Sequence, residues 1–379
     1  MKKLLTILTQ ENNIKNTKRE HIMKKLLTIL TVGGLYAAAT AQAQQVDLYI
    51  TGSTAFRSNT YRSIRALYGA NLTGQNPADA GGNASGSNIV TWSGTMSAFG
   101  SQVVMIHASY SGSAAGVQAL VQNPNLTFYA SATAGDGTTL SHTADLALSD
   151  VFQSTTAYPK PALVDSTVGV QPFVYVRSAA TPTTVTNITI QQLQAFMSGG
   201  LEPLSYFTGN AADDSNLMYL VGRDTGSGTR ITVERDALII GSPLLWAPDA
   251  TCAWNVSPGF SSGSGIVTVL NGACGAAIGY LGIADAKNVN TGANILSYDG
   301  VKPFYGPIIT PNYTPVLKGL YSCWSYEHLF IRSGAAANVV TFRNSLKTEI
   351  NNDLATSTTA IQVGAMKVSR AADGGAISP

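Results

Sequence analysis

Three short polar turns in this chain each follow a strand-like apolar segment and precede a segment with helical spacing. The turns are Gly-Ser-Thr at 52–54, Ser-Gly-Ser at 111–113 and Gly-Ser-Gly-Thr at 226–229. Repeated alternation of strand, turn and helix predicts an α/β fold, because a helical crossover is the usual connection between parallel strands. We therefore expect a central, mostly parallel sheet that is flanked by helices.

Apolar periodicity locates the individual elements. Alternating or continuous apolar residues predict strands, and apolar residues three and four positions apart predict helices. The predicted strands are 46–50, 103–106, 145–150, 173–176, 218–221 and 276–283, and the predicted helices run through 56–68, 117–121, 190–197 and 231–240. The segments 69–101 and 124–144 are rich in Gly, Ser, Thr and Asn without strong periodicity, so they are expected to be surface insertions or hairpins.

The first 43 residues are predicted to be absent from the mature protein. The string MKKLLTIL occurs at Met1 and again at Met23, and the second copy leads into a short apolar run that ends at Ala43. Lysines, a short apolar run and a small-x-small site are the features of a secretory signal peptide. We expect translation to start at Met23, with 1–22 an upstream extension, and cleavage after Ala43. No Cys follows that site, so we expect a periplasmic or secreted protein without a lipid anchor.

Removal of the leader reverses the net charge. The whole chain has a formal net charge of +2, but residues 1–43 contain seven Lys/Arg and two Glu, so the remainder has 16 basic and 19 acidic residues. A net charge near −3 leaves no basic surface for nucleic acid. About 336 mature residues exceed what one hydrophobic core usually serves, so two domains are expected. No later segment has the roughly 18 consecutive apolar residues of a membrane span.

The cysteines and histidines show no metal-ligand spacing. Cys252 and Cys274 could form a disulfide in an oxidising compartment, which would leave Cys323 as a buried free thiol; the sequence leaves this pairing open. The chain has no Cys-x-x-Cys, and its histidines are scattered, so we expect neither a metal site nor a cofactor.

The segment RDTGSGTR at 223–230 fits two kinds of site. Asp224-Thr225-Gly226 resembles the active-site turn of aspartic proteases, but those need two carboxylates that share a proton, and no second such turn occurs. A serine hydrolase has no support, since no Gly-x-Ser-x-Gly follows a strand in the required way. The other interpretation is an anion site. Small residues let the backbone approach an oxyanion, a helix N-terminus offers N–H groups, and Arg223 offers a bidentate fork.

Six segments, in the same order along the chain, resemble motifs of one protein family. Those at 52–56, 112–117 and 148–150 resemble a Gly-Ala-Thr-Phe turn, a Gly-Ser-Ser/Ala-Gly-Gly-Val loop and a strand that ends in Ser-Asp. Those at 189–199, 223–229 and 278–280 resemble a Leu-Thr-x-Glu-Gln-Leu helix, an Arg-x-x-Gly-Ser-Gly-Thr signature and an Ile-Gly-Tyr strand. The family is that of the periplasmic phosphate-binding proteins of bacterial ABC phosphate importers (PstS-like), which are type II solute-binding proteins.

The resemblance implies a two-lobed periplasmic-binding-protein type II fold with a ligand cleft between α/β lobes. Lobe 1 would comprise 46–175 and 300–379, and lobe 2 would comprise 176–299. The implied function is that of an exported, monomeric, non-enzymatic protein, which captures inorganic phosphate and delivers it to an ABC permease in the inner membrane. The implied phosphate ligands are Thr54, Ala55, Ser113, Asp150, Arg223, Ser227, Gly228 and Thr229.

Asp150 is the unusual member of this implied set, because it is a carboxylate beside an anion. It would accept a hydrogen bond from a protonated phosphate oxygen, which sulfate does not have. In the family an acidic residue usually stands directly before Gly-Ser-Gly-Thr, whereas here Thr225 separates Asp224 from that motif.

Two other functions remain open. One is a surface or extracellular matrix protein that has this fold without a transport role. The other is a phosphatase-type phosphoester enzyme, although hydrolysis usually needs metal ligands or a nucleophile with a base, and the sequence shows neither.

Overall fold

The structure is a computed structural model, which describes residues 17–24, 45–79, 84–239, 241–292 and 294–379. Residues 17–24 form a short helix in an N-terminal unit, and the unit Val46–Pro379 contains everything that is discussed below. The expected start at Met23 falls in that helix, whereas the expected cleavage site after Ala43 lies outside the described residues. Within the described parts of the chain, no helix is both long enough and apolar enough to cross a membrane.

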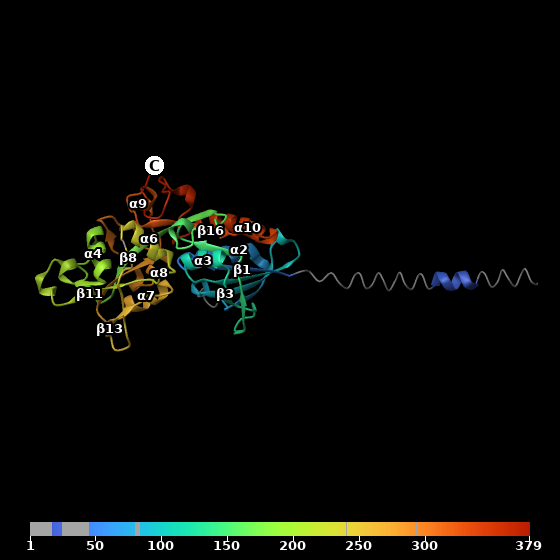
Figure 1. The fold of residues 1–379 in the computed structure, drawn as a ribbon, viewed down its shortest axis with the longest axis horizontal. Coiled ribbons are helices and arrows are strands. Elements are labelled where there is room, and N and C mark those ends of the chain that lie inside the picture. The colour runs from blue at the N-terminus through green and yellow to red at the C-terminus, as the bar shows by residue number, and fades with distance from the viewer. Residues whose placement is uncertain (1–16, 25–44, 80–83, 240, 293) are drawn as a thin grey trace, which may run out of the picture. The chain divides into compact units, whose positions relative to one another are not determined.

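A ten-stranded sheet forms the centre of the unit, with the strand order β10-β11-β14-β8-β16-β7-β1-β4-β3-β2 (Figure 1). Its strands are β1 Val46–Gly52, β2 Leu72–Asn76, β3 Ile89–Thr95, β4 Val103–Ser109, β7 Leu146–Ser149, β8 Thr167–Arg177, β10 Leu201–Pro203, β11 Leu217–Val221, β14 Ala276–Gly282 and β16 Trp324–Ile331. Parallel pairing joins β1 to β4 and to β7, and β11 to β14. Three of these strands, β1, β4 and β11, end in the polar turns.

Two long strands, β8 and β16, lie in the middle of the sheet and pair antiparallel with each other. β8 also pairs with β14, and β16 also pairs with β7, so the two strands connect the parallel groups. Periodicity predicts only 173–176 of β8 and no strand at β16. The reason is that β16 buries Ser325, Glu327 and His328, which interrupt the apolar run that would mark a central strand.

Helices cover the sheet, as expected, which confirms the α/β fold class. They are α2 Arg57–Tyr68, α3 Ser113–Gln122, α4 Ile190–Gly199, α5 Ser205–Thr208, α6 Gly228–Asp236, α7 Gly263–Asn271, α8 Ile283–Ala286, α9 Thr314–Leu317 and α10 Ala337–Leu354. α3 packs on β1 and β7, and both α6 and α7 pack on β14. α6 begins three residues before the predicted helix at 231–240, because the Ser227 side chain caps it by accepting a hydrogen bond from the Arg230 N–H.

The remaining strands lie in the expected insertions and in small ribbons: β5 Leu126–Tyr129 with β6 Thr139–His142, β12 Leu245–Pro248 with β13 Trp254–Ser257, and β9 Asn187–Ile188 with β15 Ser297–Tyr298. β5 and β6 make a hairpin within the second insertion. The first insertion contributes β2 and β3 to the main sheet, where β3 pairs along the whole of β4 and buries Trp92. A disulfide joins Cys252 to Cys274, whose Cα atoms are 4.8 Å apart, and Cys323 is a buried free thiol.

The buried apolar residues form two large clusters. One includes Phe173, Tyr280 and Trp324, and the other includes Phe56 and Phe342. Buried residues between 304 and 324 pack in the first of these clusters. The exact lobe limits, 46–175 with 300–379 against 176–299, stay a prediction.

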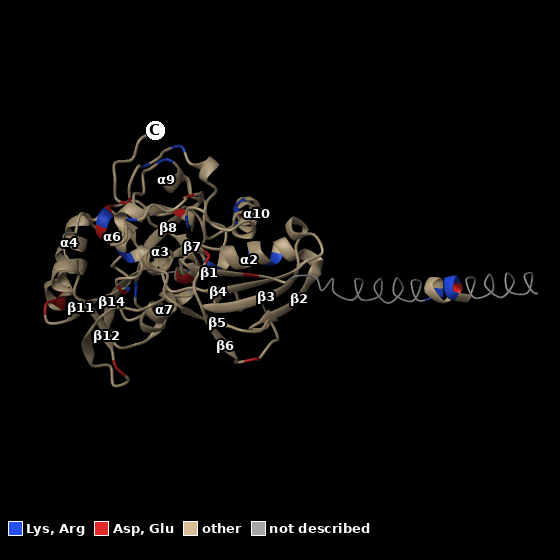
Figure 2. Ribbon diagram, turned by 45° about the vertical axis from the view of Figure 1, so that its right-hand side comes forward, with Lys and Arg blue, Asp and Glu red and all other residues tan. Residues whose placement is uncertain are grey.

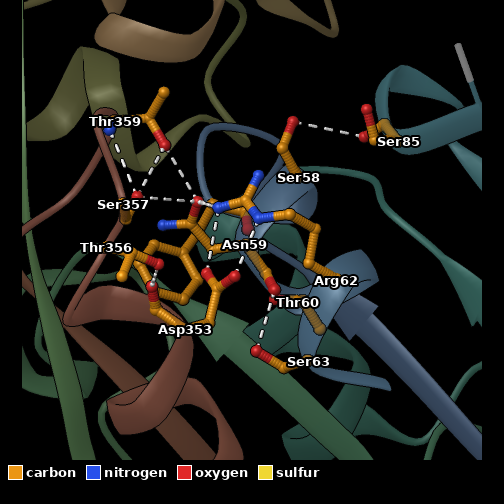
Figure 3. A network of polar contacts seen from close by, with 11 residues as sticks. Ser58, Asn59, Thr60, Arg62, Ser63, Ser85, Asp353, Thr356, Ser357 and Thr359 are labelled. Atoms are coloured by element: carbon orange, nitrogen blue, oxygen red, sulfur yellow. Dashed lines mark hydrogen bonds and ion pairs between the residues drawn. The ribbon is translucent and has the colours of Figure 1, made fainter. Parts of the chain in front are cut away.

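A polar network ties α2, which begins just after the turn at 52–54, to the end of α10 (Figure 3). Arg62 donates from Nε and Nη2 to the two carboxylate oxygens of Asp353, over 2.7 and 2.9 Å. Asn59 Oδ1 accepts from Arg62 Nη2 at 2.6 Å and from the Thr359 hydroxyl at 2.9 Å. A bidentate pair with shared partners has less side-chain freedom to lose, so this network fixes α2, the helix that follows the first polar turn.

Candidate anion-binding site

The three polar turns meet one another. The N–H of Gly112 donates to Gly52 O at 2.9 Å, and the N–H groups of Ala114 and Ala115 donate to Gly226 O at 3.0 and 3.3 Å. The approach requires glycine at 112, because its φ is +108° and a Cβ there would lie 2.6 Å from Gly226 O. The turns after β1 and β4 therefore form one cluster with the turn after β11.

Arg223 is the cation of this cluster, and only 2% of its surface is exposed. Its Nε donates to Phe260 O at 3.0 Å, and its Nη2 donates to Ser261 O at 2.8 Å and to Thr54 Oγ1 at 3.0 Å. These three bonds fix the plane of the guanidinium. Its Nη1 has no acceptor among the described residues, so one face of the fork is available to a ligand.

The neighbouring acid, Asp224, does not orient Arg223. Its Oδ1 accepts from the Gly226 N–H at 3.0 Å, and its carbonyl accepts from the Ser227 N–H at 3.2 Å, so it stabilises its own turn. Backbone carbonyls at 260 and 261 orient the guanidinium instead. Sequence reasoning missed these two positions, because a carbonyl acceptor can come from any residue type and leaves no motif.

Asp150 follows β7 and is 1% exposed. Its N–H donates to Ser113 Oγ at 3.2 Å, and its Oδ1 has no hydrogen-bond partner among the described residues. Burial raises the pKa of Asp150 to about 6; Ser113 and Arg223 lower this pKa, and Asp373 raises it. Asp150 is therefore an acceptor that can take a proton near neutral pH.

The N-termini of α3 and α6 differ in what they offer an anion. The first amides of α3 after Ser113 are already bonded to Gly226 O, so α3 contributes mainly the Ser113 hydroxyl. The N–H groups of Gly228 and Thr229, in the first turn of α6, have no acceptor within the described residues. These groups lie at the positive end of the helix dipole, where an anion is stabilised.

Several donors of the cluster thus lack an acceptor anywhere in the described part of the chain. They are the backbone N–H groups of the buried residues Ala55, Gly228 and Thr229, and the side-chain donors Thr229 Oγ1 and Arg223 Nη1. A buried donor that stays unpaired costs about 1–3 kcal/mol, so the three N–H groups indicate a missing acceptor. Of the eight sequence-predicted site residues, Arg223 contacts Thr54, and Asp150 contacts Ser113 and lies against Gly228. The other three, Ala55, Ser227 and Thr229, are neighbours of these in the sequence, and the binding role of all eight stays a prediction.

Gly228 is sterically constrained, and a substitution there tests the cluster. A Cβ at Gly228 would overlap Asp150 Oδ1 and lie 2.6 Å from Ser113 Cβ, whereas a Cβ at Gly226 would meet its nearest atom at 3.4 Å. We expect Gly228→Ala to reduce anion affinity at least about tenfold, the equivalent of 1.4 kcal/mol, because Asp150 must move. Gly226→Ala is the matched control. Calorimetric titration of both variants is the measurement, and equal affinities would contradict the placement of Gly228 against Asp150.

The histidines of the compact unit do not join the cluster. His107 lies within 2.8 Å of Tyr129 O and 3.2 Å of the Thr91 hydroxyl, and its ring stacks on Tyr49. Such contacts are those of a structural residue. Among the described residues, no group of three or more His, Cys, Asp or Glu could hold a metal ion. Figure 2 shows Lys/Arg and Asp/Glu scattered along the ribbon, and Arg223 and Asp150 are among the charged residues that are buried.

Comparisons with known proteins concern the fold. No family model matches the chain, and no curated protein matches it. A phosphate ABC transporter substrate-binding protein from Clostridium perfringens, solved with bound phosphate, superposes with a TM-score of 0.53 at 14% identity over 84% of this chain and 99% of that chain.

Two further solved structures have lower scores. An ABC-type phosphate transport receptor from Vibrio cholerae has a TM-score of 0.48 at 17% identity, over 83% of this chain and 99% of that one. The phosphate-bound periplasmic protein PfluDING has a TM-score of 0.45 at 14% identity, over 84% and 90%. The likeness to the Clostridium perfringens protein shows that this chain shares the α/β fold of a phosphate ABC transporter substrate-binding protein.

Proposed function

We propose that the mature chain is an exported solute-binding protein that captures one inorganic phosphate ion and delivers it to an ABC permease. One observation supports the proposal: the cluster of polar turns contains backbone N–H groups of buried residues without an acceptor, the guanidinium of Arg223 and one unpaired carboxylate oxygen, Asp150 Oδ1. That combination suits an anion which accepts many hydrogen bonds and still has a proton of its own to donate.

The donors replace the water that phosphate loses on entering the site. The groups proposed to bind its oxygens are the N–H groups of Ala55, Gly228 and Thr229, the hydroxyls of Thr54, Ser113, Ser227 and Thr229, and the guanidinium of Arg223. A dehydrated anion binds only where such bonds compensate the lost hydration. Hydrogen bonds between charged partners are about twice as strong as neutral ones, so Arg223 is expected to contribute most.

Asp150 provides the selectivity for phosphate. Its Oδ1 accepts the proton of HPO₄²⁻ or H₂PO₄⁻, which satisfies an acceptor that is otherwise unpaired. Sulfate has no proton at neutral pH, so the same oxygen would face an oxygen of like charge. A site with a buried polar group rejects a ligand that leaves this group unpaired by a large factor.

Capture between two lobes is part of the same proposal. The two clusters of buried apolar residues support two bodies, and the turns at 52–54 and 226–229 would belong to opposite lobes. Closure of the lobes on the ion would commit it for transfer. Periplasmic or secreted location, a monomeric state and binding without catalysis complete the proposal, and the shared fold of a substrate-binding protein supports them.

Isothermal titration calorimetry of the mature protein tests this function. The protein is first stripped of carried-over phosphate by unfolding and refolding with its disulfide intact, and it is then titrated with phosphate and with sulfate. We expect phosphate to bind with a dissociation constant of about 1 μM or lower, a binding free energy of about −8 kcal/mol, and sulfate to bind far more weakly. Equal binding of both anions, or of neither, would refute the assignment.

Two further measurements separate the alternatives. Steady hydrolysis of a phosphate monoester by the purified protein would indicate the phosphatase-type function. If the protein bound phosphate but did not stimulate phosphate uptake by a reconstituted permease, the result would favour the surface or matrix function.

A further inference from the structure

Glu327 is a fully buried carboxyl group that the proposed ligand set does not use. It lies on β16 and has no exposed surface, and neither of its carboxyl oxygens has a hydrogen-bond partner among the described residues. Burial of an unpaired carboxylate is among the most costly arrangements in a protein. A buried carboxyl group without a partner is expected to hold a proton, because its neutral form costs far less to bury.

The strand register places Glu327 beside the anion site. In the antiparallel pair of β16 and β7, His328 lies opposite Ser149, so Glu327 comes level with Asp150. The pairing of β16 with its other neighbour, β8, shifts register between Glu327 and His328, because β8 has one extra residue there. Asp150 Oδ1 is unpaired as well, so two unsatisfied carboxyl groups occupy the same level of neighbouring strands.

The groups that face Glu327 come from several elements. Burial raises the pKa of Glu327 well above its ordinary value, the negative charge of Asp150 after β7 raises it further, and the hydroxyl of Ser53 after β1 lowers it. Tyr110, after β4, also faces it, and burial raises the pKa of this phenol above its ordinary value while Arg57 of α2 lowers it. Two neighbouring buried carboxyls cannot both ionise at low cost, so Asp150 carries the charge and Glu327 the proton.

We infer that Glu327 is a second carboxyl group of the anion site, a positioning residue that donates a hydrogen bond from its neutral form toward Asp150, directly or through one water. The inference rests on the proposed phosphate-binding function and deepens it. The donated bond satisfies one oxygen of Asp150 and stabilises its charged form, which must accept the phosphate proton. Only one negative charge of the protein then faces the anion.

The charge of Glu327 makes phosphate affinity depend on pH. An acid whose pKa is raised stays neutral until the pH exceeds that raised pKa, so Glu327 ionises at a higher pH than an ordinary glutamate does. Its ionisation adds a second negative charge beside Asp150 and opposes a bound dianion. Phosphate affinity should therefore fall as the pH rises, and by linkage the binding of phosphate should raise proton uptake by the protein in that range.

Phosphate titrations of the wild type and Glu327→Gln, from about pH 6 to about pH 10, test the inference. Glutamine keeps the shape and an N–H donor but cannot ionise. We expect the two proteins to bind phosphate within about threefold of each other at neutral pH, and the wild type to lose at least about tenfold more affinity at the alkaline end. Asp145→Asn is the matched control, since Asp145 is a partly buried carboxyl that also has a raised pKa, at the opposite end of β7 from Asp150.

A measurement that does not depend on phosphate binding tests the role of Glu327 separately from the proposed phosphate-binding function. Infrared difference spectra between the wild type and Glu327→Gln should show the carbonyl stretch of a protonated carboxylic acid at neutral pH. Identical pH profiles for the wild type and Glu327→Gln, with phosphate binding intact, would overturn the inference and leave the proposed function standing. Absence of the infrared band would overturn it independently, and absence of phosphate binding in the wild type at every pH would refute both proposals.

Discussion

Arg223→Ala should weaken phosphate binding by about 100- to 1,000-fold, which corresponds to the loss of two charge-assisted hydrogen bonds of about 1.5–3 kcal/mol each, with partial compensation. The guanidinium is almost fully buried, and three bonds to Phe260 O, Ser261 O and Thr54 Oγ1 hold it in one orientation. Alanine removes the positive charge that attracts the anion, and it leaves those three acceptors unpaired. Calorimetry measures the loss.

Arg332→Ala is the control for the removal of a partly buried arginine. Arg332 donates to Ala144 O at 2.6 Å, before the start of β7, whereas Asp150 follows the end of that strand, so its replacement should leave phosphate affinity unchanged. Sulfate and phosphate should weaken by the same factor in Arg223→Ala, because the fork does not distinguish them. A variant that kept wild-type phosphate affinity would show that Arg223 has only a structural role.

Asp150→Asn should abolish most of the discrimination between phosphate and sulfate. The asparagine amide oxygen can still accept the phosphate proton, and the removal of a negative charge favours any anion, so phosphate affinity should change only modestly. Sulfate gains more, because asparagine can turn its NH₂ group toward the ion and donate a hydrogen bond of about 1.5–3 kcal/mol. The ratio of the two dissociation constants measures the effect. Continued exclusion of sulfate by the variant would show that Asp150 is not the proton acceptor.

Asp150→Asn should also raise the stability of the phosphate-free protein, and the pH at which this gain appears follows from the raised pKa of Asp150. Because burial raises the pKa of Asp150 from 3.8 to about 6, the folded state holds its proton more tightly than the unfolded chain does. Stability is therefore lost as the pH rises between these two values, by at most about 3 kcal/mol. The melting temperature of phosphate-free Asp150→Asn should exceed that of the wild type above about pH 6 and equal it below about pH 4. Equal melting temperatures of the wild type and Asp150→Asn at neutral pH would mean that burial does not destabilise the charged form of Asp150.

The sequence by itself determined the elements and the residue types of the site. The strand, turn and helix order at 46–68, 103–121 and 218–240 predicted an α/β fold, and the structure has it. The small residues and the Arg of 223–229 predicted an anion site rather than a protease. Such features are local, since periodicity, helix caps and small residues act within a few positions of one another.

Only the tertiary structure decided which groups meet and which stay unpaired. Sequence patterns did not reveal that carbonyls at 260 and 261 orient Arg223, or that Gly226 O takes up the first amides of α3. They also missed β16 and with it Glu327, which the register of β7 and β16 places beside Asp150. Backbone carbonyls carry no residue signature, and a buried acid in a central strand contradicts the apolar pattern that predicts one. Burial and strand register, which are properties of the folded chain, determine the charge of Asp150 and Glu327.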